Sequence, residues 1–260
     1  MTPRVSVLCS VRDGARFLPA ALESVRAQTF GDFELILIDD GSTDETPELV
    51  DRAARDDPRV VAIHQANLGL TRALNVGLGR ARGEIVARQD ADDVSLPHRL
   101  ADQVAFLDRH PGHLVVGCRY LRVDERGAVL GRSRVPCTDL GIKIRLLRAN
   151  AIAHSTATFR RREVLEAGGY DEGLTVAQDY DLWCRLALRG RLANLPEVGL
   201  RRREHAAAIG STHAEAQVEA RDAIRVRYCD AVLGAAPGGL SGLLLRAAAS
   251  RRRRRSPCAS

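Results

Sequence analysis

Three carboxylates stand close together in the segment Asp90-Ala91-Asp92-Asp93. Carboxylates at this spacing repel one another unless a cation or hydrogen-bond donors neutralise them. A divalent cation held by one or two carboxylates and by substrate phosphates is one explanation. An acidic loop that only caps the following helix is the other. The segment comes directly after a predicted buried strand, which favours a metal and a nucleotide ligand.

A second acidic group, Asp39-Asp40, is followed by Gly41 and Ser42 at the end of another apolar run. Asp-Gly-Ser is good turn and helix-capping chemistry, so a purely structural role is one interpretation. Two adjacent aspartates at a strand end also need hydrogen-bond partners. We expect both roles, with a carboxylate that accepts from a nucleotide base or a ribose hydroxyl.

Asp179 stands at the start of a predicted helix, where the helix dipole stabilises an anion. Spacing alone does not distinguish a helix cap from a general base at this position. His154 and His205 are isolated histidines, and such residues are more often structural or exposed than catalytic.

The elements that position these residues alternate between short apolar strands and amphipathic helices. This alternation predicts an α/β fold with a Rossmann-like, mostly parallel central sheet flanked by helices on both faces. Ligands bind at the carboxyl ends of the strands in such sheets, and three polar segments fall there. The predicted strands are 5–9, 33–38, 60–63 and 84–88; the helices are 17–25, one from about residue 43, and 70–81; the polar segments are 10–13, 39–40 and 90–93.

The pattern becomes more irregular after Pro97. We expect a single domain over residues 1–235, with a nucleotide-binding half at about 1–110, an acceptor half at about 111–210 and a small C-terminal helical extension. Residues 236–260 are predicted to be a basic, disordered tail. The expected elements are helices near 100–107, 140–148, 178–188 and 213–232, a hairpin of 114–123 with 128–135, a short strand at 156–159 and an extended segment at 192–201.

Composition is that of an ordinary globular protein, with 45% hydrophobic and 28% charged residues. Much of the net charge of +6 comes from Arg251–Arg255, so a nucleic-acid-binding surface across the domain is not supported. The basic run is interpreted as a solvated end or, alternatively, as a peripheral contact with an anionic membrane. Six scattered cysteines without zinc spacing indicate reduced thiols. With no signal peptide or membrane span expected, these features predict a protein of the cytoplasm or the inner membrane face.

Taken in order along the chain, many short motifs resemble those of family 2 glycosyltransferases. The resemblance covers about residues 5 to 188 and implies a GT-A fold, a nucleotide-diphosphate sugar donor, a divalent metal such as Mn²⁺ or Mg²⁺, and inversion at the anomeric carbon. The motifs are Val5-Ser6-Val7, Gln28-Thr29-Phe30, Phe33-Glu34-Leu35, Asp39 to Asp44, Asn67-Leu68-Gly69, Ala81 to Glu84, Asp90 to Asp93, Leu96-Pro97, Arg99-Leu100 and Gly168 to Asp171.

The resemblance assigns the nucleotide to positions in the first half of the chain. Ser10, Arg12 and Arg72 correspond to positions that contact the nucleotide. In the Asp39-Asp40 segment, Asp40 corresponds to a carboxylate that binds the base, commonly uracil, so a UDP-sugar donor is expected. The aromatic residue often found at the position of Arg12 is absent, which leaves base stacking there without its usual partner.

The resemblance also assigns the metal and the base. Asp90 and Asp92 match the DxD motif; Asp92, with Asp93 beside it, resembles the metal ligand, and His205 resembles a late histidine near the metal or diphosphate. Asp179 resembles the catalytic base.

The acceptor, a glycan or a lipid-linked molecule, is expected near His154 and Gln178. Gln178 replaces the family's more usual glutamate before the base. The sequence leaves two alternatives open: a sugar nucleotidyltransferase, and a non-catalytic module that binds nucleotide-sugars.

Overall fold

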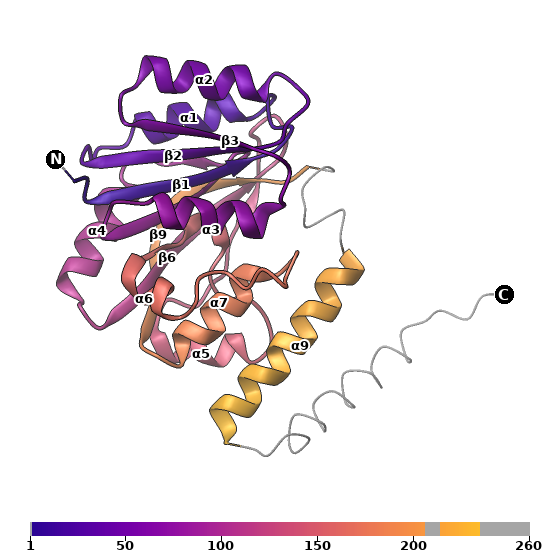
Figure 1. The fold of residues 1–260 in the computed structure, drawn as a ribbon. Coiled ribbons are helices and arrows are strands. Elements are labelled where there is room, and N and C mark those ends of the chain that lie inside the picture. The colour runs from indigo at the N-terminus through magenta and orange to yellow at the C-terminus, as the bar shows by residue number, and fades with distance from the viewer. Residues whose placement is uncertain (1, 206–213, 235–260) are drawn as a thin grey trace.

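The computed structural model describes residues 2–205 and 214–234 (Figure 1). Strands and helices alternate through its first half, as the sequence predicts. The strands are β1 (Val5–Val11), β2 (Phe33–Asp40), β3 (Val60–Gln65), β4 (Ile85–Asp90), β5 (Val94–Ser95), β6 (His113–Val123), β7 (Val129–Arg132), β8 (Thr158–Arg160) and β9 (Arg191–Arg203). The helices are α1 (Leu18–Arg26), α2 (Thr46–Asp56), α3 (Leu70–Arg80), α4 (Arg99–Arg109), α5 (Asp139–Leu146), α6 (Arg161–Glu166), α7 (Gln178–Ala187) and α9 (Ala214–Leu233), with the 3-10 turn η1 (His154–Thr156).

All described strands join one sheet in the order β3-β2-β1-β4-β8-β6-β9-β5, and β7 pairs with β6. The pairs among β3, β2, β1 and β4 are parallel. Every residue of β1 and β2 is buried, because helices cover both faces of this part of the sheet. Burial on both faces explains why these strands are continuous apolar runs in the sequence.

The two faces of the sheet support two apolar cores. Successive β1 side chains alternate between them: Val7 packs in the core that includes α1, α2 and α4, and Leu8 packs in the core that includes α3 and α7. Figure 1 shows α1 and α2 on one side of β1–β3 and α3 on the other. The predicted α/β architecture is therefore confirmed.

Beyond β4 the sheet is mixed. β8 runs antiparallel to both β4 and β6, while β6 and β9 form a long parallel pair with register shifts. The predicted hairpin is present as β6 and β7 around the turn at residues 124–127. The mostly parallel character that we expected thus applies to the part of the sheet formed by β1 to β4.

Helix α2 begins at Thr46, three residues later than the predicted start. The reason is a network of side chains that holds the preceding segment as a loop. Asp13 Oδ1 accepts a hydrogen bond from Thr43 N at 2.7 Å, and Asp44 Oδ1 accepts from Thr46 N at 3.0 Å. Asp44 thus stands before the helix, and Glu48 is the acidic residue in its first turn.

The C-terminal helix α9 packs against α7, and its residues Ile224 and Tyr228 are buried in the core. The predicted tail at 236–260, with Arg251–Arg255, lies outside the described residues. The five cysteines within them are free thiols, four of them buried. Across 2–205 and 214–234, no helix combines the length and apolar character needed to span a bilayer.

Candidate active site

The parallel register brings the predicted polar segments to one edge of the sheet. Ser10 lies beside Ile38 of β2 and Asp90 of β4, and Val11 lies beside Asp39. The loops after β1, β2 and β4 therefore begin at nearly the same level. This edge is where open α/β sheets bind ligands.

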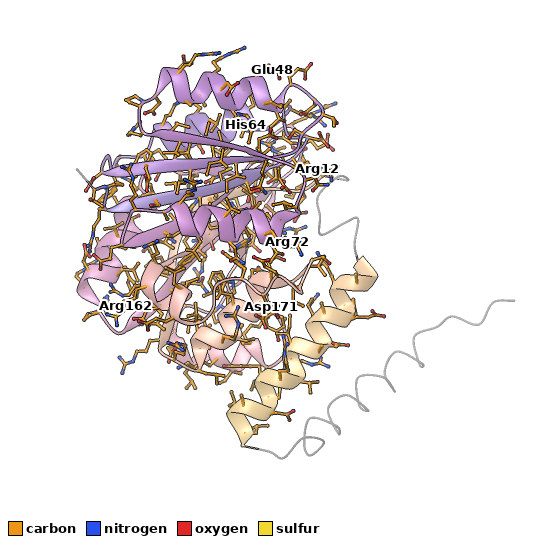
Figure 2. All side chains as sticks on the ribbon, in the orientation of Figure 1. Arg12, Glu48, His64, Arg72, Arg162 and Asp171 are labelled. Carbon is orange, nitrogen blue, oxygen red and sulfur yellow. The ribbon has the colours of Figure 1, made fainter. Side chains whose placement is uncertain are left out.

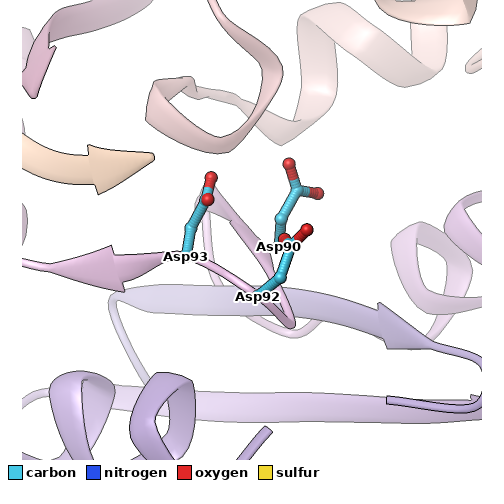
Figure 3. Close-up of side chains that lie close together, drawn as sticks. All are labelled: Asp90, Asp92 and Asp93. Carbon is cyan, nitrogen blue, oxygen red and sulfur yellow. The ribbon is translucent and has the colours of Figure 1, made fainter. Parts of the chain in front are cut away.

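Asp90, Asp92 and Asp93 form an acidic cluster at this edge (Figure 3). Each offers one carboxylate oxygen, and these atoms all lie within 4.8 Å of one another. Asp90 Oδ1 accepts from Arg88 Nη2 at 2.6 Å, and Asp93 Oδ1 accepts from Arg203 N at 2.8 Å. Asp92 Oδ2 lies 2.8 Å from Nε2 of His205, so the late histidine does reach the cluster. Each carboxylate keeps acceptor capacity beyond these contacts.

The electrostatics of the cluster favour a cation. Burial and the charge of Asp90 raise the pKa of Asp92, and the same causes raise the pKa of Asp93 further. Burial is the largest single effect on Asp90 and opposes its ionisation, but the charges of Arg88 and of further neighbours such as Arg202 and Arg99 together lower the pKa of Asp90. A divalent ion would relieve this repulsion, and hard cations prefer carboxylate oxygens. The residues present therefore fit the expected metal.

The Asp39-Asp40 pair is buried, and its carboxylates hold two loops. Asp39 accepts hydrogen bonds from Ser42 N and from Nδ1 of His64, both at 3.0 Å, which is the expected turn chemistry. Asp40 accepts from Gln65 Nε2 at 2.7 Å and from the backbone N–H groups of residues 68 and 69 at 2.9 Å. Asp40 thus secures the loop between β3 and α3, and its role toward a base stays a prediction.

The other predicted nucleotide contacts surround this edge. Ser10 is buried within β1. Arg12 is exposed and lies 3.7 Å from Asp13, measured from Nε to Oδ2. Arg72 is exposed and pairs with Glu172 at 3.6 Å. Figure 2 shows Arg12 and Arg72 on the same side of the molecule, where weak surface pairs leave both free to turn toward a ligand.

Asp179, in the first turn of α7, is held by two donors. Asn150 Nδ2 donates to Oδ2 at 2.6 Å, and Tyr180 N donates to Oδ1 at 2.8 Å. Burial nevertheless raises the pKa of Asp179 above that of an exposed aspartate, and the charge of Asp90 adds to the shift. A perturbed carboxylate beside an acidic cluster is suited to accept a proton.

Strained backbone occurs at two non-glycine residues among those described, and both flank this site. Asp13 has φ +48° in the loop after β1, and Ala177 has φ +58° directly before Gln178 and Asp179. Such conformations are costly for residues with a side chain and concentrate at functional sites. Gln178 itself is buried at the first position of α7.

His154 lies in η1, and its Nε2 is 2.9 Å from the hydroxyl of Tyr170. Burial, together with the charge of Arg88, lowers the pKa of His154 to about 3. The imidazole is therefore neutral at physiological pH and acts through hydrogen bonding, not as a cation. Its contact with the predicted acceptor stays a prediction.

Sequence reasoning missed four residues of the site. Arg88 is 1% exposed and pairs with Asp90, while Arg203 donates from Nε to Asp92 O at 3.0 Å. Burial opposes ionisation of Asp90 and Asp179, and the charge of Arg202 acts against this effect at both residues. Asn150 binds the predicted base. The only sequence signals were Arg88 two residues before Asp90 and the arginine run at 201–203.

An α/β sheet with an acidic cluster at its carboxyl edge is typical of enzymes that bind nucleotide-diphosphate ligands together with a metal. The sequence pattern of Glycosyl transferase family 2 matches residues 6–169. An amylovoran biosynthesis glycosyltransferase of Erwinia amylovora is 35% identical over 197 residues, covering 74% of this chain and 73% of the relative. A putative glycosyltransferase of Bacillus subtilis is 35% identical over 207 residues, covering 78% and 73%. The chain belongs to glycosyltransferase family 2 and is a transferase enzyme.

Solved structures support the same fold. S. aureus TarS, in complex with UDP-GlcNAc, superposes with a TM-score of 0.69 at 19% identity, covering 91% of this chain and 74% of that one. The mannosyltransferase of Pyrobaculum calidifontis, in complex with GDP-Man and Mn²⁺, gives a TM-score of 0.62 at 23% identity, covering 96% and 80%. The predicted GT-A fold is confirmed.

Proposed function

We propose that this glycosyltransferase moves a sugar from a UDP-sugar to an acceptor hydroxyl, with inversion at the anomeric carbon. The relatives named for amylovoran biosynthesis and, in Escherichia coli, for O-antigen biosynthesis support a role in making polysaccharide or surface glycan. The structural neighbour that binds UDP-GlcNAc supports the choice of uridine. Family membership favours glycosyl transfer over the nucleotidyl transfer and the purely binding role that the sequence left open.

The observation that carries the proposal is the acidic cluster of Asp90, Asp92 and Asp93, whose carboxylate oxygens lie within 4.8 Å of one another. Burial raises the pKa of Asp179 and the charge of Asp90 adds to the shift, which supports a base near this cluster. Asp90 and Asp179 come from different halves of the chain, Asp90 from β4 and Asp179 from α7. A donor diphosphate over the cluster and an acceptor beside Asp179 would bring the reacting atoms together.

In this mechanism Asp179 takes the proton from the acceptor hydroxyl as its oxygen attacks the anomeric carbon. The bond from that carbon to the diphosphate oxygen breaks on the opposite face, which inverts the configuration. Asp90, Asp92 and Asp93 would hold the divalent ion, with His205 bound to Asp92. The ion, when bound, neutralises charge on the departing diphosphate. Asn150 orients the base through its hydrogen bond.

A thermal-shift screen of nucleotide-sugars, with and without Mn²⁺, tests the donor, because a bound ligand raises the melting temperature by mass action. We expect a UDP-sugar to give the largest shift, and only with the metal. NMR of the product then tests inversion through the configuration of the new bond. A metal-independent shift, or a product that retains the donor's configuration, would refute the corresponding part of the proposal.

A further inference from the structure

A cavity whose lining includes no residue of the acidic cluster lies between the hairpin of β6 and β7 and helix α5. Its volume is about 850 Å³, which is within the usual range for ligand pockets. The function proposed above makes no use of this cavity. The cavity is lined by Arg119, Arg132, Ser133, Arg134, Val135, Pro136, Gly141, Ile144, Arg145, Arg148 and Ala149.

Five of these lining residues are arginines, and none is acidic. None of the five forms an ion pair with a carboxylate in the part of the chain that the structure describes, although many other arginines do. Arg119 and Arg132 donate only to Pro196 O, at 3.5 and 3.1 Å. The Nε of Arg119 is buried without a partner. The wall is thus a set of guanidinium donors that lacks an anion.

Phosphate groups match this wall best. The planar guanidinium offers paired donors that fit phosphate oxygens, and several arginines around one group suit a phosphate or diphosphate.

Exposed apolar side chains also occur on the elements that carry these arginines, and one of them, Ile144, lines the cavity. Leu140 and Ile144 are 69% and 54% exposed, and their spacing of four residues puts them on one face of α5. Val129 and Leu130 of β7 are exposed as well. Leu130 shares its face of the strand with the lining residue Arg132, because alternate residues of a strand point the same way. Exposed apolar groups of both elements therefore lie near the arginines. A free phosphate would have no use for them, whereas a lipid that carries a phosphate would contact both.

The chain also connects this wall to the reaction. Arg148 and Ala149 line the cavity, and the next residue, Asn150, binds the proposed base Asp179. A ligand that orders residues 148–149 therefore bears on the residue that orients the base.

We propose that this arginine cavity binds the phosphate-bearing headgroup of a lipid, with the apolar side chains of α5 and β7 against the lipid chain. The inference rests on the proposed function, because it makes a lipid-linked phosphate part of the acceptor for the same enzyme. Binding at the cavity presents the sugar of such an acceptor to Asp179.

Sedimentation with vesicles tests the proposal on the full chain. Phosphatidylcholine vesicles with phosphatidic acid as a minor component are compared with phosphatidylcholine alone. We expect the exposed pair Arg145→Gln/Arg148→Gln to weaken binding to the acidic vesicles on the order of tenfold or more. The matched control is Arg52→Gln/Arg55→Gln, an exposed pair on α2, which should bind as the wild type does. Equal binding by the two double variants would overturn the proposal.

A second arm separates a lipid from a soluble phosphate. Calorimetry with inorganic pyrophosphate is run in EDTA, so that no metal draws pyrophosphate to the acidic cluster. Leu140→Ser/Ile144→Ser should lose vesicle binding and keep its pyrophosphate affinity. Unchanged vesicle binding by this variant would overturn the lipid source. Binding of UDP with Mn²⁺ is measured in parallel: its absence in the wild type would count against the proposed function alone, while the vesicle result would stand.

Discussion

The side-chain amide of Asn150 donates a hydrogen bond to Oδ2 of Asp179, with 2.6 Å between the two atoms. Asn150 lies just after α5, and Asp179 lies in the first turn of α7. The bond stabilises the ionised carboxylate, while burial favours the protonated form and raises the pKa overall. Asp179 is thus oriented by one residue and kept more basic than an exposed aspartate by its surroundings.

Replacing Asn150 with alanine should raise the pKa of Asp179 further, because the ionised form loses a donor. A hydrogen bond to a charged group contributes about 1.5–3 kcal/mol, which corresponds to about 1–2 pH units. We therefore expect the acidic limb of the kcat/KM profile to move to higher pH by that amount. The measurement is initial rate against pH for both proteins. Activity that recovers at high pH supports a positioning role, and a loss that is the same at every pH contradicts it.

Asp179→Asn should lower turnover by about 10²–10⁴-fold, the usual contribution of a general base, and leave UDP binding nearly intact. It should also make the stability of the fold less sensitive to rising pH. A carboxyl whose pKa is raised by folding contributes no penalty below its unfolded pKa, and it destabilises the native state progressively as pH rises from the unfolded pKa through the folded pKa. The wild type should lose stability over this pH window, and Asp179→Asn should not.

Melting temperatures measured at several pH values test this difference in pH dependence. Asp32→Asn, at an exposed loop position, is the control. Full turnover in Asp179→Asn would show that another group is the base.

Mn²⁺ should raise the melting temperature of the wild type. At a hundredfold excess over its Kd, a bound ion should add about 2.7 kcal/mol to the free energy of unfolding. Asp92→Asn should lose most of this gain together with metal-dependent UDP affinity. Because the pKa values of Asp92 and Asp93 are raised, metal binding should weaken on acidification at a higher pH than for ordinary carboxylates. Glu48→Gln, exposed on α2, is the control. An unchanged calorimetric titration of Asp92→Asn with UDP and Mn²⁺ would refute the metal assignment.

The first half of the chain was predictable because its signals are local. Val5–Val11 and Phe33–Asp40 are buried on both faces, so they stand out as unbroken apolar runs before their polar ends. In-register parallel pairing then determines that Ser10 and Asp90 lie side by side. The acidic cluster follows from these facts without any knowledge of distant contacts.

The second half was less predictable because its geometry depends on pairing between distant segments. The shifts in register between β6 and β9 set where Arg202 and Arg203 emerge, and no local pattern encodes them. The Asn150–Asp179 bond joins residues 29 positions apart. Likewise, nothing near Asp40 in sequence indicates that backbone groups of residues 68 and 69 would use its carboxylate.

Gly41, which follows Asp40 directly, has φ +72°, a conformation that disfavours any side chain. A Cβ added there would lie 2.6 Å from Asn67 N, a backbone atom that cannot turn away. Gly41→Ala should therefore lower the free energy of unfolding by about 1–3 kcal/mol. It should also weaken UDP affinity, because the displaced loop includes the N–H groups that bind Asp40.

Gly31→Ala is the matched control, since a Cβ there meets nothing within 4 Å. Urea unfolding measures the first effect for both variants, and calorimetry with UDP and Mn²⁺ measures the second. If Gly41→Ala and Gly31→Ala unfold alike, the contact with Asn67 is not a constraint on this turn. If Gly41→Ala loses stability and keeps full UDP affinity, the loop that Asp40 secures does not contribute to the nucleotide site.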